Sequence, residues 1–212
     1  MIKICGTTNI DDALLAQKAG ADYFGVVVEH APSPRSVSLH EAVELRHNTP
    51  LPCVALTVNK PLDFLLRVAE KMRPAVFQLH GDESPQLVRE LAKNKLVVWT
   101  AIAGDEETVL RRAAAMREAG ASAILLDARA TRNGETIYGG TGERADWKLA
   151  RRLVDDGFRV ILAGGLSPQN VAEAIEVVKP WGVDCASGVE TKKGRKNAQA
   201  VQDFVFNARA AS

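Results

Sequence analysis

A short apolar run, followed by a loop and an amphipathic helical segment, recurs eight times along this chain, and this repeat limits the possible folds. The apolar runs occupy residues 2–5, 23–28, 53–58, 75–79, 96–101, 123–127, 159–163 and 182–186. Several of them, such as VVV and AILL, are apolar at consecutive positions, which is typical of parallel strands that are covered on both faces. Eight such units in 212 residues predict an α/β fold, a compact (β/α)8 barrel of the TIM-barrel class.

Local signals mark the ends of the helical segments. Ser38-x-x-Glu41 forms a capping box, and Ser-Pro pairs at 84–85 and 167–168 place proline at the first position of two further helices. Gly20 follows the tract AQKA, where a left-handed helix stop is expected. The GxGxxG fingerprint of an open dinucleotide-binding sheet is missing after the first run, which favours the closed barrel.

Composition and charge exclude several classes of partner. With 46% hydrophobic and 25% charged residues, the chain fits one well-cored domain over residues 1–212. A net charge of +1 without a basic arm argues against nucleic acid, and no apolar stretch reaches the roughly 18 residues that a membrane span needs. Three distant cysteines without CxxC spacing suggest neither disulfides nor a metal site, so we expect a cytoplasmic location. The sequence leaves monomer and homodimer equally open.

Chemically active residues gather at the ends of the predicted strands. In a barrel of this class, the strand C-termini and the loops that follow them build the functional site. Glycine turns after the last two strands frequently bind phosphate through backbone N–H groups, so we expect a phosphorylated small molecule as the ligand. The residues at these positions are Cys5, Arg35, Gln78, His80, Asp127, Gly164, Gly165, Ser187 and Gly188.

A thiol and a carboxyl group on one rim can perform acid/base chemistry on a small substrate. Cys5 ends the first strand and Asp127 ends the sixth. A base role requires the thiol pKa to fall from its usual value of about 8.5, and a nearby cation has that effect. Lys3 is a candidate for this cation because residues two apart on a strand face the same side. Strand eight neighbours strand one in a closed barrel, so we expect Asp184 to pair with Lys3 inside it.

Seven short motifs carry a family resemblance over almost the whole chain. They are KICG at 3–6, SPR at 33–35, FQLHG at 77–81, LLD at 125–127, YGGTG at 138–142, LAGGL at 162–166 and ASGVE at 186–190. In this order and at these intervals they resemble phosphoribosylanthranilate isomerase of tryptophan biosynthesis. The resemblance implies an Amadori rearrangement of an aminoaldose phosphate to an aminoketose phosphate, catalysed without a cofactor.

The resemblance also implies residue roles. It assigns the general base to Cys5 and the general acid to Asp127, and it places Arg35 beside a substrate carboxylate. The GGTG segment, with Gly140 and Gly142, is expected to supply a second phosphate-facing backbone. Gln78 is expected to touch the ligand, whereas His80 serves equally well as a packing or loop-fixing residue. The basic tract KKGRK at 192–196 is most simply the solvated start of the last helix.

Two other functions stay open from the sequence. One is a different sugar-phosphate isomerase, epimerase or synthase on the same scaffold, since fold and phosphate grip are shared among many chemistries. The other is a non-enzymatic barrel that binds a phosphorylated metabolite. The chain also departs from the family pattern in loops 29–34 and 128–138, which are longer than expected, and at Ala186, where serine is common.

Overall fold

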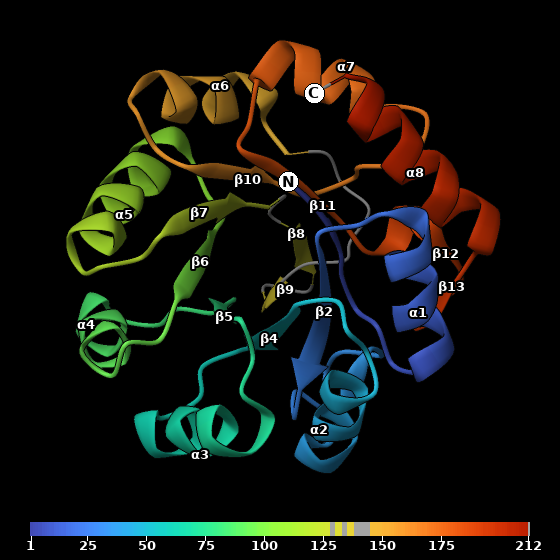
Figure 1. The fold of residues 1–212 in the computed structure, drawn as a ribbon. Coiled ribbons are helices and arrows are strands. Elements are labelled where there is room, and N and C mark those ends of the chain that lie inside the picture. Colours follow the sequence, from blue (N-terminus) through green and yellow to red (C-terminus); the bar gives the residue numbers. More distant parts are fainter. Residues whose placement is uncertain (128–129, 133–134, 138–144, 212) are drawn as a thin grey trace.

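The computed structural model describes residues 1–127, 130–132, 135–137 and 145–211, and its centre is a closed ring of eight parallel strands (Figure 1). Each strand is hydrogen-bonded to its neighbours, in the order β1, β2, β4, β5, β6, β7, β10 and β11, and β11 pairs back with β1 to close the ring. The strands are β1 (Ile2–Ile4), β2 (Tyr23–Val28), β4 (Cys53–Thr57), β5 (Val76–Leu79), β6 (Val98–Ile102), β7 (Ala123–Leu126), β10 (Val160–Leu162) and β11 (Gly182–Cys185). This topology confirms the predicted (β/α)8 barrel.

A layer of α-helices surrounds the ring (Figure 1), and one helix follows each barrel strand. They are α1 (Ile10–Ala19), α2 (Leu39–His47), α3 (Leu62–Met72), α4 (Pro85–Lys93), α5 (Glu106–Glu118), α6 (Trp147–Asp155), α7 (Val171–Val178) and α8 (Ala198–Ala210). The capping box before α2 is present, with Ser38 and Glu41 bonding each other's backbone N–H. Gly20 ends α1 with φ 88°, as a left-handed stop requires.

The predicted start of α7 was wrong. The helix begins at Val171, after Asn170, and not at the Ser167-Pro168 pair. The Asn170 side chain accepts a hydrogen bond from the Ser167 N–H at 2.8 Å and donates one to the Gly165 carbonyl at 2.9 Å. These bonds form a separate turn between β10 and the helix, so residues 167–170 belong to this turn and not to α7.

The loops at the carboxyl end of the barrel contain short strands that the sequence did not predict. β3 (Ser36–Val37) pairs with β2, while β8 (Ala130–Arg132) and β9 (Glu135–Ile137) form a hairpin after β7. A 3-10 turn at Ser187–Val189 leads into a second hairpin, β12 (Glu190–Lys192) with β13 (Arg195–Lys196). The tract KKGRK therefore lies in this hairpin, and its prediction as the solvated start of α8 was wrong.

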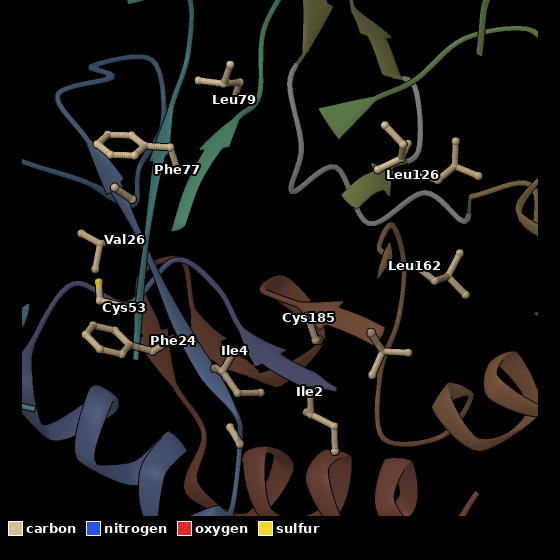
Figure 2. Close-up of a cluster of buried hydrophobic side chains, with 14 of the residues drawn as sticks. Ile2, Ile4, Phe24, Val26, Cys53, Phe77, Leu79, Leu126, Leu162 and Cys185 are labelled. Atoms are coloured by element: carbon tan, nitrogen blue, oxygen red, sulfur yellow. The ribbon is translucent and has the colours of Figure 1, made fainter. Parts of the chain in front are cut away.

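Both faces of the strands are buried, which explains their consecutive apolar residues. Figure 2 shows the outward-facing layer, in which Ile2, Ile4, Phe24 and Val26 pack toward the helices. Inside the ring, the amino-terminal end is filled by Trp99, which makes edge-to-face contacts with Tyr23 at 5.3 Å and Trp181 at 5.8 Å between ring centroids. None of the helices in the described ranges has both the length and the apolar character needed to cross a bilayer.

Candidate active site

A pocket opens at the carboxyl end of the barrel strands. Its volume is about 730 Å³ when the open solvent at its mouth is counted. Of the residues selected from the sequence, those that line it are Cys5, Arg35, His80, Asp127, Gly164, Gly165, Asp184 and Ser187. The pocket therefore brings the thiol, the carboxyl group and both glycine-containing turns to one cavity.

Cys5 and Lys3 point into the barrel because Ile2 and Ile4 occupy the alternate, helix-facing positions of β1. The Lys3 ammonium is fully buried and lies 2.9 Å from the Asp184 carboxylate, so the predicted ion pair is present. β2 makes room for these side chains with Gly25. A Cβ at that position would lie 2.9 Å from both the Cys5 Sγ and the Lys3 Cε.

The electrostatic environment of Cys5 differs from the expectation. Burial raises the pKa of the thiol, and the positive charges of Lys3 and Lys196 offset this only in part, because Asp184 acts in the opposite direction. This direction is the reverse of the expected fall in the thiol pKa, so that expectation was wrong. The buried Lys3 keeps its charge: burial works to lower its pKa, but the charges of Asp184 and Cys5 and hydrogen bonds to both outweigh burial and raise it.

Asp127 ends a chain of side-chain hydrogen bonds. The Gln78 amide nitrogen lies 2.7 Å from His80 Nδ1, and His80 Nε2 lies 3.2 Å from Asp127 Oδ2. Because an amide nitrogen only donates, this arrangement makes Nδ1 the acceptor and leaves the imidazole hydrogen on Nε2, directed at the carboxylate. The chain orients Asp127, and it stabilises the negative charge that this group carries after releasing a proton.

Arg35 binds a carboxylate with two of its nitrogens, as expected, but this carboxylate belongs to Glu190 of the protein itself. Its Nε and one terminal nitrogen each lie 2.8 Å from an oxygen of Glu190. Burial works to raise the pKa of Glu190, but hydrogen bonds from Arg35 and the charge of Lys196 outweigh it, so this pKa is lowered. Arg35 thus forms part of the pocket wall and is held there by the β12–β13 hairpin.

The two turns that are expected to face phosphate lie next to each other in the wall of the pocket. Gly164 and Gly165 adopt φ values of 76° and 64°, which glycine reaches without strain. Gly188 packs so tightly that a Cβ there would lie 2.0 Å from the Leu166 carbonyl oxygen. Glycine at 188 is therefore what allows the turn after β11 to approach the turn after β10.

The sequence reasoning missed an apolar wall of the pocket. Val27, Leu56 and Val58 cluster with Cys5 on the inner face of β1, β2 and the end of β4. The alternation of inward and outward positions along these strands could have identified them. His30, in the unusual loop after β2, also lines the pocket. Burial lowers the His30 pKa, and the charges of Lys60 and His80 act in the same direction.

Five other selected residues do not line the pocket or lie outside the described residues, and one of them is Gly188, which packs against Leu166. Lys3 and Gln78 are fully buried, so they lie in the barrel interior adjoining the pocket. Gly140 and Gly142 lie outside the described residues, so the expectation of a second phosphate-facing backbone stays a prediction. Among the residues that the structure describes, no cluster of three or more His, Cys, Asp or Glu side chains could hold a metal ion.

Comparison with known sequences gives a consistent result. The family model described as N-(5'-phosphoribosyl)anthranilate (PRA) isomerase matches residues 2–207. The N-(5'-phosphoribosyl)anthranilate isomerase of Aquifex aeolicus is 38% identical over 211 residues, with 96% of each chain covered. The enzyme of the same name from Trichlorobacter lovleyi is 40% identical over 212 residues, covering 99% of this chain and 98% of the relative.

Solved structures agree with these sequence matches. The phosphoribosyl anthranilate isomerase of Thermotoga maritima superimposes with a TM-score of 0.85 at 34% identity, covering 99% of this chain and 98% of that one. A structure of such an isomerase in complex with reduced 1-(o-carboxyphenylamino)-1-deoxyribulose 5-phosphate gives a TM-score of 0.83, with the same identity and coverage.

Proposed function

The chain belongs to the N-(5'-phosphoribosyl)anthranilate isomerase family, and we propose that Cys5 is the general base and Asp127 the general acid of its reaction. The protein is a phosphoribosylanthranilate isomerase of tryptophan biosynthesis, and its substrate is a phosphorylated small molecule. The reaction is an Amadori rearrangement, in which the ring-closed aminoaldose becomes the open aminoketose 1-(2-carboxyphenylamino)-1-deoxyribulose 5-phosphate.

The proposed chemistry needs one proton donor and one proton acceptor. Asp127 gives a proton to the furanose ring oxygen while the C1–O bond breaks, which leaves an iminium at C1. This cation acidifies the proton on C2, and the Cys5 thiolate removes it to give an enaminol. The enaminol then tautomerises to the ketone as its C2 hydroxyl loses a proton and C1 gains one. Return of the proton from Cys5 to Asp127 by way of solvent restores both groups, so no proton is consumed. Hydrogen bonding from His80 Nε2 stabilises the carboxylate that forms at Asp127.

One observation carries this assignment: Cys5 and Asp127 line the same pocket from different strands of the ring. β1 and β7 are three steps apart in the pairing order β1, β11, β10, β7, so the two groups approach a ligand from separate directions. The ammonium of Lys3 and the nitrogens of the Gln78–His80 chain supply nearby charge and orientation.

We further propose how the substrate lies in the pocket. The apolar wall of Val27, Leu56 and Val58 suits the aromatic ring of the anthranilate group, because burying a ring against apolar side chains is favourable. The turns at Gly164-Gly165 and Ser187-Gly188 then receive the phosphate through their backbone N–H groups. Arg35 also lines the pocket, and although Glu190 occupies two of its nitrogens, its guanidinium carries further N–H donors that suit the substrate carboxylate.

The decisive experiment is a fluorescence assay with freshly generated phosphoribosylanthranilate on wild type, Cys5→Ser and Asp127→Asn. Each substitution should lower kcat by at least about 10²-fold, the usual contribution of a general acid or base. Cys53→Ala is the matched control, because it removes a buried thiol that does not line the pocket, and its kcat should stay within about twofold of wild type. Unchanged turnover in either site variant would contradict that residue's role.

Three further features complete the proposal. Because Cys5, Cys53 and Cys185 are all free thiols, a reducing cytoplasmic location fits the chain. We propose that residues 1–212 form one domain, since the barrel uses the first strand and the last helix. We propose that the protein is a monomer or a homodimer. Light scattering distinguishes the two, because a monomer has a mass of 22.9 kDa and a homodimer has twice that mass.

A further inference from the structure

Lys196 has a fully buried side chain, although the acid/base mechanism does not use it. Lysine is almost never fully buried unless its charge is paired. It lies on β13, the second strand of the hairpin that follows the phosphate-facing turn, and its neighbours Lys192, Lys193 and Arg195 are exposed. Its burial thus singles it out within the basic tract.

All three hydrogens of the Lys196 ammonium have an acceptor. Nζ lies 2.5 Å from the Cys5 carbonyl oxygen, 3.1 Å from the Ala186 carbonyl oxygen and 3.1 Å from Glu190 Oε1. Its backbone N–H donates to the Asp12 carboxylate at 3.1 Å, which ties β13 to α1. An ammonium group has three donors and no acceptor, so this site satisfies it completely.

The two carbonyls belong to different parts of the site. Cys5 follows β1, and Ala186 follows β11 immediately before the turn at Ser187–Val189. Between β1 and β11, Cys5 N–H donates to the Cys185 carbonyl at 2.8 Å, one residue before Ala186. The ammonium therefore continues the link between these two segments at the place where the first and last barrel strands meet.

We propose that Lys196 is a positioning residue, whose single ammonium fixes the backbone of the base Cys5 relative to the phosphate-facing turn after β11. This inference rests on the proposed role of Cys5. With the phosphate held at the turn, the distance from the turn to the thiol decides whether Sγ reaches the C2 proton. Displacements of about 1 Å at such a position cost about 10²-fold in rate.

Lys196 also acts on the charge of the site. The charged groups that act on the Cys5 thiol include Lys3 and Asp184 inside the barrel, Lys196 from β13 and Arg35 from the loop after β2. Of these, Lys3 and Lys196 favour the thiolate and Asp184 opposes it. Since Lys3 is already paired with Asp184, Lys196 supplies a second, independent stabilisation of the thiolate, even though Glu190 shares its charge.

Lys196→Met tests the proposal, because methionine keeps the length and apolar stem of the side chain but cannot donate. The matched control is Lys193→Met, which removes the same charge from an exposed position of the same hairpin. Two kinds of measurement are made on each folded variant. The first is kcat and KM for phosphoribosylanthranilate, and the second is the pH dependence of Cys5 alkylation by iodoacetamide, located by peptide mass spectrometry.

In Lys196→Met we expect kcat to fall about 10²-fold and KM to rise, and the alkylation midpoint to move to higher pH. Lys193→Met should match wild type in all three. If Lys196→Met is less stable but keeps wild-type kcat and alkylation midpoint, the residue is purely structural and the inference fails. If Lys196→Met does not fold, Lys196→Leu, which likewise cannot donate, replaces it with the same expectations, and failure of both variants to fold would also overturn the inference.

Assays of wild type and Cys5→Ala in the same series separate this inference from the proposed function. Full activity in Cys5→Ala would remove Cys5 as the base, whatever Lys196 does. Loss of activity in Cys5→Ala together with normal kcat, KM and alkylation in Lys196→Met would leave the base assignment standing and reject only the role of Lys196.

Discussion

Gly25→Ala tests whether the space beside Cys5 is required for catalysis. Gly25 lies on β2, opposite Val54 of β4, and faces the barrel interior. A methyl group there would lie 2.9 Å from Cys5 Sγ, 2.9 Å from Lys3 Cε and 3.1 Å from Lys3 Nζ. Favourable contacts of this kind lie at about 3.5–4.0 Å, so both side chains must move away from the methyl group by roughly 0.6 Å or more, or the backbone at residue 25 must shift.

The ion pair limits how far Lys3 can move, so Cys5 is displaced more. Lys3 is held 2.9 Å from Asp184 in a fully buried position, and displacing it would break that contact. Cys5 Sγ has the open pocket on one side and therefore yields more easily. Overpacking should lower the free energy of unfolding by about 1–3 kcal/mol, and displacement of the base should lower kcat by about 10²-fold.

Gly182→Ala is the matched control for this substitution. Gly182 is also an interior glycine, at the start of β11, and its added Cβ would lie 2.3 Å from the flexible Met1 Cε and 3.0 Å from the Met1 carbonyl oxygen. Both variants are assayed for turnover by fluorescence and for stability by urea unfolding. Both should lose stability, but only Gly25→Ala should lose kcat. Wild-type kcat in Gly25→Ala would refute the requirement for space at Cys5.

Three other outcomes follow from the structure. Because burial raises the pKa of Cys5, kcat/KM should rise by up to about tenfold per pH unit between pH 7 and 9, and a flat profile would argue against a thiolate base. Folding raises the pKa of all three thiols, to about 12 for Cys185, so each thiol contributes fully to the free energy of unfolding at any pH below its pKa in the unfolded chain. Above a pH of about 8.5 the free energy of unfolding should fall by up to about 1.4 kcal/mol per pH unit for each thiol. Urea unfolding midpoints at pH 8 and pH 10 would show this fall. Trp99→Ala should lower the free energy of unfolding by about 3–5 kcal/mol with kcat nearly unchanged, because its cluster lies at the opposite end of the barrel from the pocket.

The sequence predicted the barrel strands well because each is buried on both faces. A strand covered by helices outside and by side chains inside must be apolar at almost every position, so its run stands out from the polar loops. The predicted run 23–28 coincides with β2, and the others differ from the observed strands by one or two residues at one or both ends. The hairpins β8–β9 and β12–β13 gave no such signal, because their strands have only two or three residues and are rich in polar side chains.

Strand parity also predicted part of the site. It placed Lys3 and Cys5 on one face and paired Lys3 with Asp184, and the register Lys3 to Asp184 between β1 and β11 is the one observed. Strand parity could not predict whether the pKa of Cys5 is raised or lowered. It is a balance between desolvation and opposing charges, and desolvation depends on how completely the surrounding loops cover the thiol, which the positions of residues along a strand do not reveal.

Lys196 shows most clearly what separates a pattern from a packed structure. In the sequence it is one of four basic residues in KKGRK, and such a tract is usually solvated. The hairpin register places it directly opposite Glu190 and turns it inward, while the other three basic residues stay exposed. Two of its three acceptors are backbone carbonyls, which have no sequence signature because every residue carries one. A buried charge satisfied by main-chain oxygens is therefore visible only after the chain has folded, and it is the kind of contact through which one residue can align the base with the phosphate-facing turn.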